Sequence, residues 1–218
     1  MAHQQRRNAA FGDVQTPITL ARDICSLLAQ SGFQPASILE PTCGTGAFLK
    51  ASLETFPDVS CALGYEINPC SVAHARRRVA ETGHHAAIEV VQADFFTTLW
   101  EEIVAALPEP LLIIGNPPWI TNAALRAFGG VNAPPKANLD HMRGIDACTG
   151  KSNFDISEWM MRKQIEWLMQ KNGALAMVCK TSVARKVLWY AWKNDLRIDS
   201  ASMYLLDAQQ YFGASVDA

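Results

Sequence analysis

Four consecutive residues of this chain could orient an amino group for reaction: Asn116, Pro117, Pro118 and Trp119. Each proline lacks a backbone N–H and fixes its own φ, and it also restricts the residue before it. The amide of Asn116 and the carbonyl oxygen of Pro117 are therefore held side by side as acceptors, next to the flat ring of Trp119. Two acceptors beside a stacking ring suit a planar group with an NH2, such as the Watson–Crick edge of adenine. The alternative is a tight turn that ends in a core tryptophan.

The segment before this tetrapeptide must position it. Residues 111–115 are apolar apart from a final glycine, a pattern typical of a strand buried on both faces of a parallel sheet. In open α/β sheets, ligands bind at the carboxyl ends of the strands. The tetrapeptide is therefore expected at the ligand-binding edge of a central strand.

Short apolar strands alternate with helical patterns through the rest of the chain. This alternation predicts an α/β fold with a doubly wound, mostly parallel sheet. The expected strands cover 37–40, 61–66, 88–93, 111–115, 174–179 and 201–206, and helices are expected to begin near 17, 47, 69, 156 and 181. Residues 211–218 are similar to the start of one more strand. The region 121–153, rich in Gly, Pro, Asn and Ala, is typical of a lid, a binding loop or a disordered segment.

A glycine-containing loop follows the first expected strand and runs from Glu40 to Gly46. Its two glycines let the backbone turn sharply and let a ligand approach closely. The third glycine of the dinucleotide-binding fingerprint would fall at position 49, which is leucine, so this loop is of another kind. Glu66 ends the second strand 20 residues after Gly46. At about that spacing, a doubly wound sheet places an acid on a ribose diol.

Two further segments contain residues that could either bind a ligand or serve the fold alone. Asp94 and Phe95 follow the third strand, where an acid and a ring could bind the edge and face of an adenine, or could equally cap a helix and fill the core. Thr16 and Pro17 suit the N-cap and first position of a helix that Gly32 ends. For Thr16, helix capping alone and a part in ligand binding are equally open.

The composition narrows the class of protein. The 218 residues suit one domain with a sizeable core, and no apolar run approaches the ~18 residues of a membrane span. The polar start carries no secretory signal. The six cysteines form no CxxC pair, which favours free thiols over a zinc site or disulfides. Together these features indicate a cytoplasmic protein. The net charge of -2 is unlike that of a strongly basic nucleic-acid-binding domain.

The motifs agree in order and spacing with one family. Over nearly its whole length the chain resembles the γ group of DNA adenine-N6 methyltransferases, including those of restriction–modification systems. The matching segments are F-G-x-x-x-T-P at 11–17, acid-P-x-x-G-x-G at 40–46, an acid at 66, an acid–aromatic pair at 94–95, N-P-P-aromatic at 116–119 and a pocket-lining segment at 150–159. In that family, the N-P-P-aromatic motif is specific for methylation of an amino nitrogen.

The resemblance implies the Rossmann-like fold of the class I S-adenosylmethionine-dependent methyltransferases, with S-adenosylmethionine as the cofactor and no metal. It implies cofactor contacts from Thr16, Pro17, Glu40, Pro41, Gly44, Gly46, Glu66, Ile67, Asp94, Phe95, Asn116 and Phe154. It assigns catalysis to Asn116, Pro117, Pro118, Trp119 and Phe212, the last as a second aromatic ring for the target base.

The implied reaction is methyl transfer to N6 of an adenine flipped out of double-stranded DNA. The same motif occurs in methyltransferases acting on RNA bases or on protein glutamine, and a non-catalytic domain that binds flipped bases is a third alternative. Residues 1–218 are expected to form one catalytic domain without a membrane anchor. The family normally places target recognition after that domain, so a recognition region after Ala218 or a partner subunit is expected. A missing last strand would leave an exposed sheet edge that favours self-association.

Overall fold

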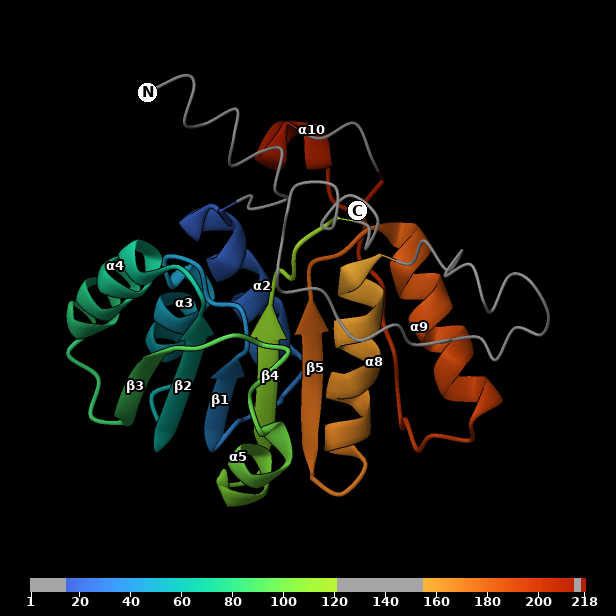
Figure 1. Ribbon diagram of the computed structural model, residues 1–218, viewed down its shortest axis with the longest axis horizontal. Coiled ribbons are helices and arrows are strands. Elements are labelled where there is room, and N and C mark those ends of the chain that lie inside the picture. The colour runs from blue at the N-terminus through green and yellow to red at the C-terminus, as the bar shows by residue number, and fades with distance from the viewer. Residues whose placement is uncertain (1–14, 121–154, 214–216) are drawn as a thin grey trace.

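The computed structural model describes residues 15–120, 155–213 and 217–218. Five parallel strands form one sheet in the order β3-β2-β1-β4-β5 (Figure 1). The strands are β1 (Ser37–Glu40), β2 (Cys61–Glu66), β3 (Ala87–Gln92), β4 (Leu111–Gly115) and β5 (Gly173–Met177). The predicted parallel α/β sheet is thereby confirmed. Predictions that concern 11–14 and 121–154, including the one for Phe154, lie outside the described residues.

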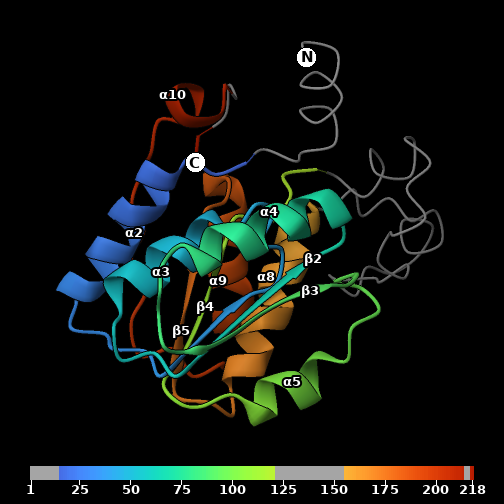
Figure 2. The same ribbon diagram turned by 90° about the vertical axis from the view of Figure 1, so that its left-hand side faces the viewer.

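Helices cover both faces of the sheet (Figure 2). They are α2 (Ile18–Gln30), α3 (Ala47–Thr55), α4 (Pro69–Ala80), α5 (Trp100–Ala106), α8 (Ile156–Leu168), α9 (Thr181–Lys193) and the short α10 (Ala208–Phe212). Helices α2, α3 and α4 pack on one face, and α5 and α8 pack on the other, where α9 lies against α8. In the part of the chain that the structure describes, no helix is long and apolar enough to cross a membrane.

Strand β4 is buried on both faces, as its sequence predicts. Leu111, Leu112, Ile113 and Ile114 are fully buried. Successive side chains of a strand point to opposite faces. Leu112 and Ile114 accordingly lie in the core under α2 and α3, whereas Leu111 and Ile113 lie in the core under α5 and α8. This burial fixes the strand whose end carries the N-P-P-W tetrapeptide.

The strand order places a topological switch point between β1 and β4. The chain runs outward from β1 through β2 to β3 and then returns to β4, which pairs with β1 on its other side. Loops after β1 and β4 therefore leave the sheet in opposite directions at its carboxyl edge, where a crevice for ligands forms. The carboxyl ends of β1 and β4 lie within contact distance of each other. A Cβ added at Gly115 would lie 3.7 Å from Cγ of Glu40.

The strand predicted over 201–206 is wrong, since these residues form no strand. Met203, Tyr204 and Leu205 are 46%, 68% and 78% exposed. A strand is stabilised by its ladder with a neighbour, and β5 pairs only with β4 among the described strands. The backbone N–H of Leu206 instead donates to the carbonyl of Ala218 at 2.8 Å. An apolar pattern without an adjacent strand is not enough to form sheet.

Two helices are also corrections to the sequence analysis. Helix α10 replaces the expected start of a strand at 211, because the side chain of Asp207 accepts hydrogen bonds from the N–H groups of Gln209 and Gln210 at 3.0 and 3.1 Å and caps a helix. The helix start considered after the third strand is a cap at Asp94, whereas α5 begins at Trp100 with Leu99 as its N-cap. Glu101 and Glu102 in its first turn favour a helix start there.

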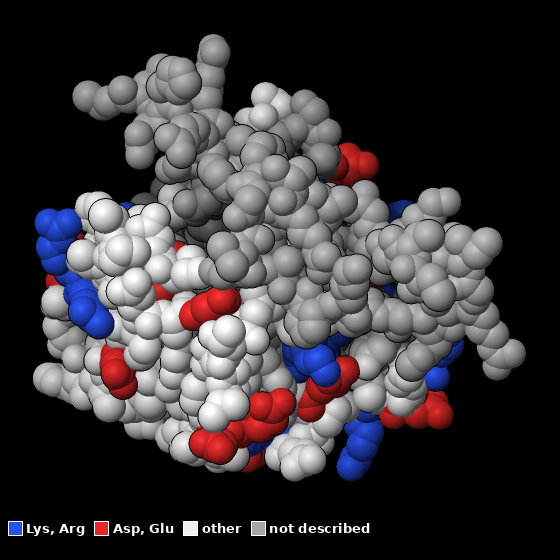
Figure 3. All heavy atoms as spheres, viewed as in Figure 1, with Lys and Arg blue, Asp and Glu red and all other residues white. Residues whose placement is uncertain are grey.

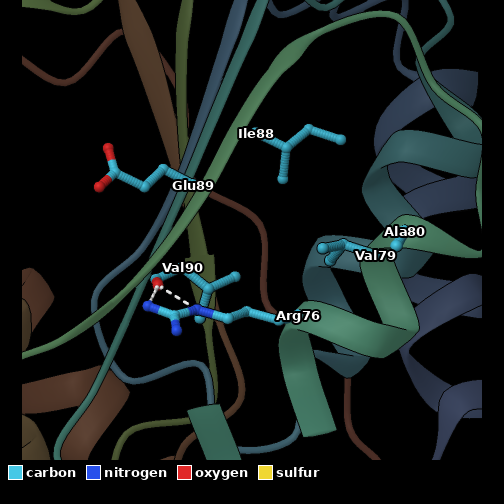
Figure 4. A pocket seen from close by; sticks show the side chains of 6 residues that line it. All are labelled: Arg76, Val79, Ala80, Ile88, Glu89 and Val90. Carbon is cyan, nitrogen blue, oxygen red and sulfur yellow. Dashed lines mark hydrogen bonds between the residues drawn. The ribbon is translucent and has the colours of Figure 1, made fainter. Parts of the chain in front are cut away.

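An open hollow lies between α4 and β3, the outer strand on the side of the sheet away from β5 (Figure 4). Its lining residues are Arg76, Val79, Ala80, Ile88, Glu89 and Val90. The guanidinium of Arg76 donates twice to the carbonyl of Val90, at 3.0 and 2.8 Å. None of the predicted cofactor or catalytic residues lines this hollow. Arg76 occupies an acceptor of the edge strand, which hinders pairing of β3 with another chain.

We expect Gly46→Ala to destabilise the fold more than Gly32→Ala. Both glycines have φ near +80°, at +79° and +83°, so both substitutions carry the same backbone strain. A Cβ at Gly46 would also lie 3.0 Å from Cβ and 3.1 Å from Cα of Ala75 in α4, whereas Gly32 has open space around it. In urea unfolding, the free energy of unfolding should fall further in G46A than in G32A, by about 1–3 kcal/mol. Equal losses would contradict close packing of the glycine loop on α4.

Candidate active site

Asn116 lies at the carboxyl end of β4 and holds its amide in one orientation. Its Nδ2 donates to the hydroxyl of Thr16 at 3.3 Å. Its Oδ1 is buried and has no hydrogen-bond partner among the residues that the structure describes. A buried acceptor left unpaired costs about 1–3 kcal/mol. A buried acceptor thus stands at the position that the sequence predicts, and its contact with an amino group stays a prediction.

The contact with Asn116 also corrects the expected role of Thr16 in capping. Helix α2 begins at Ile18, with Pro17 at the N-cap position and no capping bond from a side chain. The hydroxyl of Thr16 points instead to the residue that follows β4. The capping role weighed for Thr16 is therefore wrong, and its part in ligand binding stays a prediction.

The two aromatic residues predicted for the target base lie together. The ring centroids of Trp119 and Phe212 are 5.2 Å apart with an interplanar angle of 74°, an edge-to-face pair. The indole Nε1 of Trp119 donates to the carbonyl of Val178, just after β5, at 3.4 Å. Phe212 comes from the end of α10. Two rings distant in sequence thus form one aromatic pair after the end of β4.

Glu66 joins the end of β2 to the glycine loop. Its two carboxylate oxygens accept from the backbone N–H of Gly44 at 3.0 Å and of Asn68 at 2.8 Å. The N–H of Cys43 donates to the carbonyl of Tyr65 at 2.7 Å, which ties the same two segments. These bonds hold the carboxylate of Glu66 at the carboxyl end of β2, beside the glycine loop. Its contact with a ribose stays a prediction.

The residues predicted around an adenine differ in exposure. Ile67 follows Glu66 and is 47% exposed at the carboxyl edge. Asp94 accepts from the N–H of Phe96 at 3.0 Å and stabilises a turn. The ring of Phe95 is buried in the core under α5 and α8, with its centroid 5.1 Å from that of Trp100. The core role weighed for this pair is present for Phe95, and its contact with a cofactor stays a prediction.

Glu40 ends β1 and is almost fully buried. One carboxylate oxygen accepts from the N–H of Leu49 at 2.9 Å. Burial raises the pKa of Glu40 well above its ordinary value, and the nearby charge of Glu66 raises it further, while the Leu49 N–H and Arg78 act in the opposite direction. A cation bound beside this carboxyl would favour its ionised form. Pro41, which begins the loop, is also buried.

Sequence reasoning missed two residues at this edge. The side-chain oxygen of Gln15 accepts from the N–H and the hydroxyl of Thr45, at 3.0 and 2.9 Å, so Gln15 lies against the glycine loop. Lys180 contacts the carbonyl of Trp119 at 3.2 Å. A signal for Lys180 was available, because it follows β5 much as Asn116 follows β4. The position of Gln15 depends on a long-range contact that no local pattern carries.

These features fit a nucleoside with a positively charged end. The carboxylate of Glu66 stands at the end of β2, and the glycine loop beside it turns through Gly44, whose φ is +50°. The buried carboxyl of Glu40 lies under the same edge, and Asn116 presents a free acceptor across the switch point. S-adenosylmethionine has such a ribose and such a cation, so the residues present suit it.

Comparison with solved structures defines the class. The structure of a putative class I S-adenosylmethionine-dependent methyltransferase from Listeria monocytogenes matches with a TM-score of 0.55 and 16% identity, over 93% of this chain and 58% of that one. The fold is therefore that of the class I S-adenosylmethionine-dependent methyltransferases, as the sequence predicts. The predicted cofactor is the one that this class uses.

Comparison with curated proteins defines the family. The Type II methyltransferase M.NspV from Nostoc sp. is 39% identical over 214 residues, which are 98% of this chain and 44% of the relative. The Type II methyltransferase M.CvrRI from Paramecium bursaria Chlorella virus XZ-6E is 31% identical over 151 residues, 69% of this chain and 32% of the relative. No family model matches. The chain belongs to the Type II methyltransferases and spans less than half the length of these two relatives. Its place in the γ group stays a prediction.

We expect Glu40→Gln to make stability less sensitive to rising pH. Because burial raises the pKa of Glu40 in the folded state, the stability of its protonated form is present below the ordinary value of 4.5 and is lost as the pH rises. Urea unfolding from about pH 5 to about pH 8 should give E40Q a flatter decline than the wild type.

Glu54→Gln is the control for this experiment. The hydrogen bond from Arg22 lowers the pKa of Glu54. The small contribution of Glu54 to stability is therefore lost as the pH falls, which is the opposite pH dependence to that of Glu40. Identical pH slopes for E40Q and the wild type would contradict a raised pKa for the buried carboxyl of Glu40.

Proposed function

We propose that this chain transfers a methyl group from S-adenosylmethionine to the N6 amino group of an adenine flipped out of double-stranded DNA, as part of a restriction–modification system. The observation that carries the proposal is the buried, unpaired Oδ1 of Asn116, held by Thr16 at the switch point of a methyltransferase fold. Its position suits an acceptor for one N–H of the amino group. The carbonyl of Pro117 would accept the other.

The two acceptors act on the nucleophile. Adenine N6 is a poor nucleophile because its lone pair is delocalised into the ring. Hydrogen bonds from both N–H groups to Asn116 and Pro117 favour a more pyramidal nitrogen whose lone pair points out of the ring plane. Bound S-adenosylmethionine would supply an electrophilic methyl group on its sulfonium. Fixed acceptors aimed at the amino group and correct placement both lower the barrier.

The target base must leave the duplex to reach this edge. Stacking on aromatic rings is worth about 1–3 kcal/mol per base and offsets part of the cost of flipping. Trp119 and Phe212 would supply these rings, with Pro118 fixing the backbone that leads into Trp119. Their edge-to-face contact at 5.2 Å supports a shared role.

The cofactor would lie along the other side of the switch point. Glu66 would bind the ribose, with Ile67, Asp94 and Phe95 around the adenine. The methionine part would meet the following residues: Thr16, Pro17, Glu40, Pro41, Gly44 and Gly46. Phe154 is assigned to the pocket on resemblance alone.

Duplex DNA is the proposed partner on the strength of the relatives. Both are named Type II methyltransferases, which favours DNA over an RNA base or a glutamine amide. Acidic and basic side chains are interspersed over the described elements on the face in Figure 3. Phosphate contacts supply much of DNA affinity. We expect weak, strongly salt-dependent DNA binding by the described residues.

Titration calorimetry tests the cofactor half of the proposal. The wild type should bind S-adenosylmethionine and its demethylated product. Asp94→Asn should weaken both, because it removes the charge that would pair with the adenine amine and keeps an oxygen for the N–H of Phe96. A folded wild type that binds neither compound at about millimolar concentration would remove the methyltransferase proposal.

Asn116→Ala tests the catalytic half. The methyl transfer rate should fall by about 10²–10³-fold, with cofactor affinity nearly unchanged. Asn194→Ala is the control, since Asn194 is exposed at the end of α9 and donates only to the carbonyl of Tyr190, at 2.8 Å, in the described structure. Thr16→Val should lower the rate in the same direction and Thr16→Ser should restore it, because serine keeps the acceptor for Nδ2. Transfer by N116A at a near wild-type rate would exclude Asn116 from catalysis.

A further inference from the structure

Lys180 follows β5 at the carboxyl edge, and its side chain contacts the segment after β4 at Trp119. Its Nζ donates to the carbonyl of Trp119 at 3.2 Å and to Oδ2 of Asp155 at 2.7 Å. The two charged side chains are 23% and 10% exposed. An ion pair this far from solvent holds its geometry better than a surface pair, because water competes less for both partners.

Asp155 is itself fixed in position. It is the N-cap of α8, and its Oδ1 accepts from the N–H of Ser157 at 3.0 Å. Next to it, the N–H of Ile156 donates to the carbonyl of Ile120 at 2.9 Å. The start of α8 and the end of the N-P-P-W segment are therefore joined directly, and Lys180 bridges the same two segments.

Trp119 is consequently held at two points by the residues that follow β5. Its indole Nε1 donates to the carbonyl of Val178, and its own carbonyl accepts from Lys180. One bond fixes the ring and the other fixes the backbone that carries it. The N–H of Val178 in turn donates to the carbonyl of Gly115 at 3.0 Å, so the position of Trp119 is set relative to the end of β4.

We propose that Lys180 is a positioning residue for methyl transfer. Its ammonium, held by Asp155, fixes the Trp119 carbonyl and so the ring on which the target base stacks. Lys180 acts through Trp119 and does not touch the base. The inference rests on the proposed function for its catalytic consequence, whereas the contact itself can be tested without substrate.

The first test measures the ring of Trp119 in the protein labelled with 5-fluorotryptophan. Substitution of Trp119 by Phe assigns its ¹⁹F resonance among those of the six tryptophans. In Lys180→Met, this resonance should shift and broaden. The chemical shifts of Trp100 and Trp167, which lie in the core under α5 and α8, should stay unchanged.

Lys171→Met is the matched control. The Nζ of Lys171 also donates to backbone carbonyls, of Ala105 at 3.0 Å and Leu107 at 2.9 Å, but at the amino-terminal side of the sheet. It should leave the Trp119 resonance unchanged. Asp155→Asn breaks the same ion pair from its other side and serves if K180M does not fold. An unmoved Trp119 resonance in a folded K180M or D155N overturns the inference.

The second test measures catalysis. K180M should lower kcat by about tenfold to a hundredfold with the KM for the cofactor unchanged, and Lys180→Arg should recover part of the loss. In a Trp119→Ala background, which lacks the ring, K180M should add little. Fully additive losses would indicate a general structural effect and contradict the inference. Failure of the folded wild type to bind S-adenosylmethionine refutes the proposed function, whereas an unmoved ring refutes the role of Lys180 alone.

Discussion

The parallel pairing of β1 with β4 is the constraint on which the site depends. Ser37, Ile38 and Leu39 lie opposite Leu111, Leu112 and Ile113 in register. This register brings the ends of the two strands to the same level, with the glycine loop leaving on one side and Asn116 on the other. The fully buried side chains of β4 fix the register, because a shift by one residue would reverse which face each side chain meets. Apolar burial thus determines where the polar groups of the site stand.

The site keeps polar groups whose burial costs stability. The Oδ1 of Asn116 has no partner within residues 15–120 and 155–213, and the carboxyl of Glu40 lies in the interior with a raised pKa. A fold selected for stability alone would satisfy or replace such groups. Both stand at the switch point, where the proposed substrate and cofactor would supply the missing partners. The hydrogen bond from Asn116 to Thr16 keeps the free oxygen in place until then.

The sequence predicts those parts of the structure that depend on local patterns. The burial of β4 and the position of Glu66 follow from apolar runs and strand ends. The contacts of Thr16 with Asn116 and of Lys180 with Trp119 could not be predicted, since each joins distant segments and depends on the finished packing. The strand expected over 201–206 fails for a related reason, because strand formation needs a neighbour that a single segment does not specify.

The central claim is that the acceptors at Asn116 and Pro117 are built for the amino group of adenine. The most direct measurement supplies the protein with mixed-sequence duplex DNA and S-adenosylmethionine labelled in its methyl group, digests the DNA to nucleosides and identifies the labelled nucleoside by mass spectrometry. The account predicts N6-methyldeoxyadenosine, absent when N116A replaces the wild type. Label on the amino group of cytosine in place of N6-methyldeoxyadenosine would contradict it.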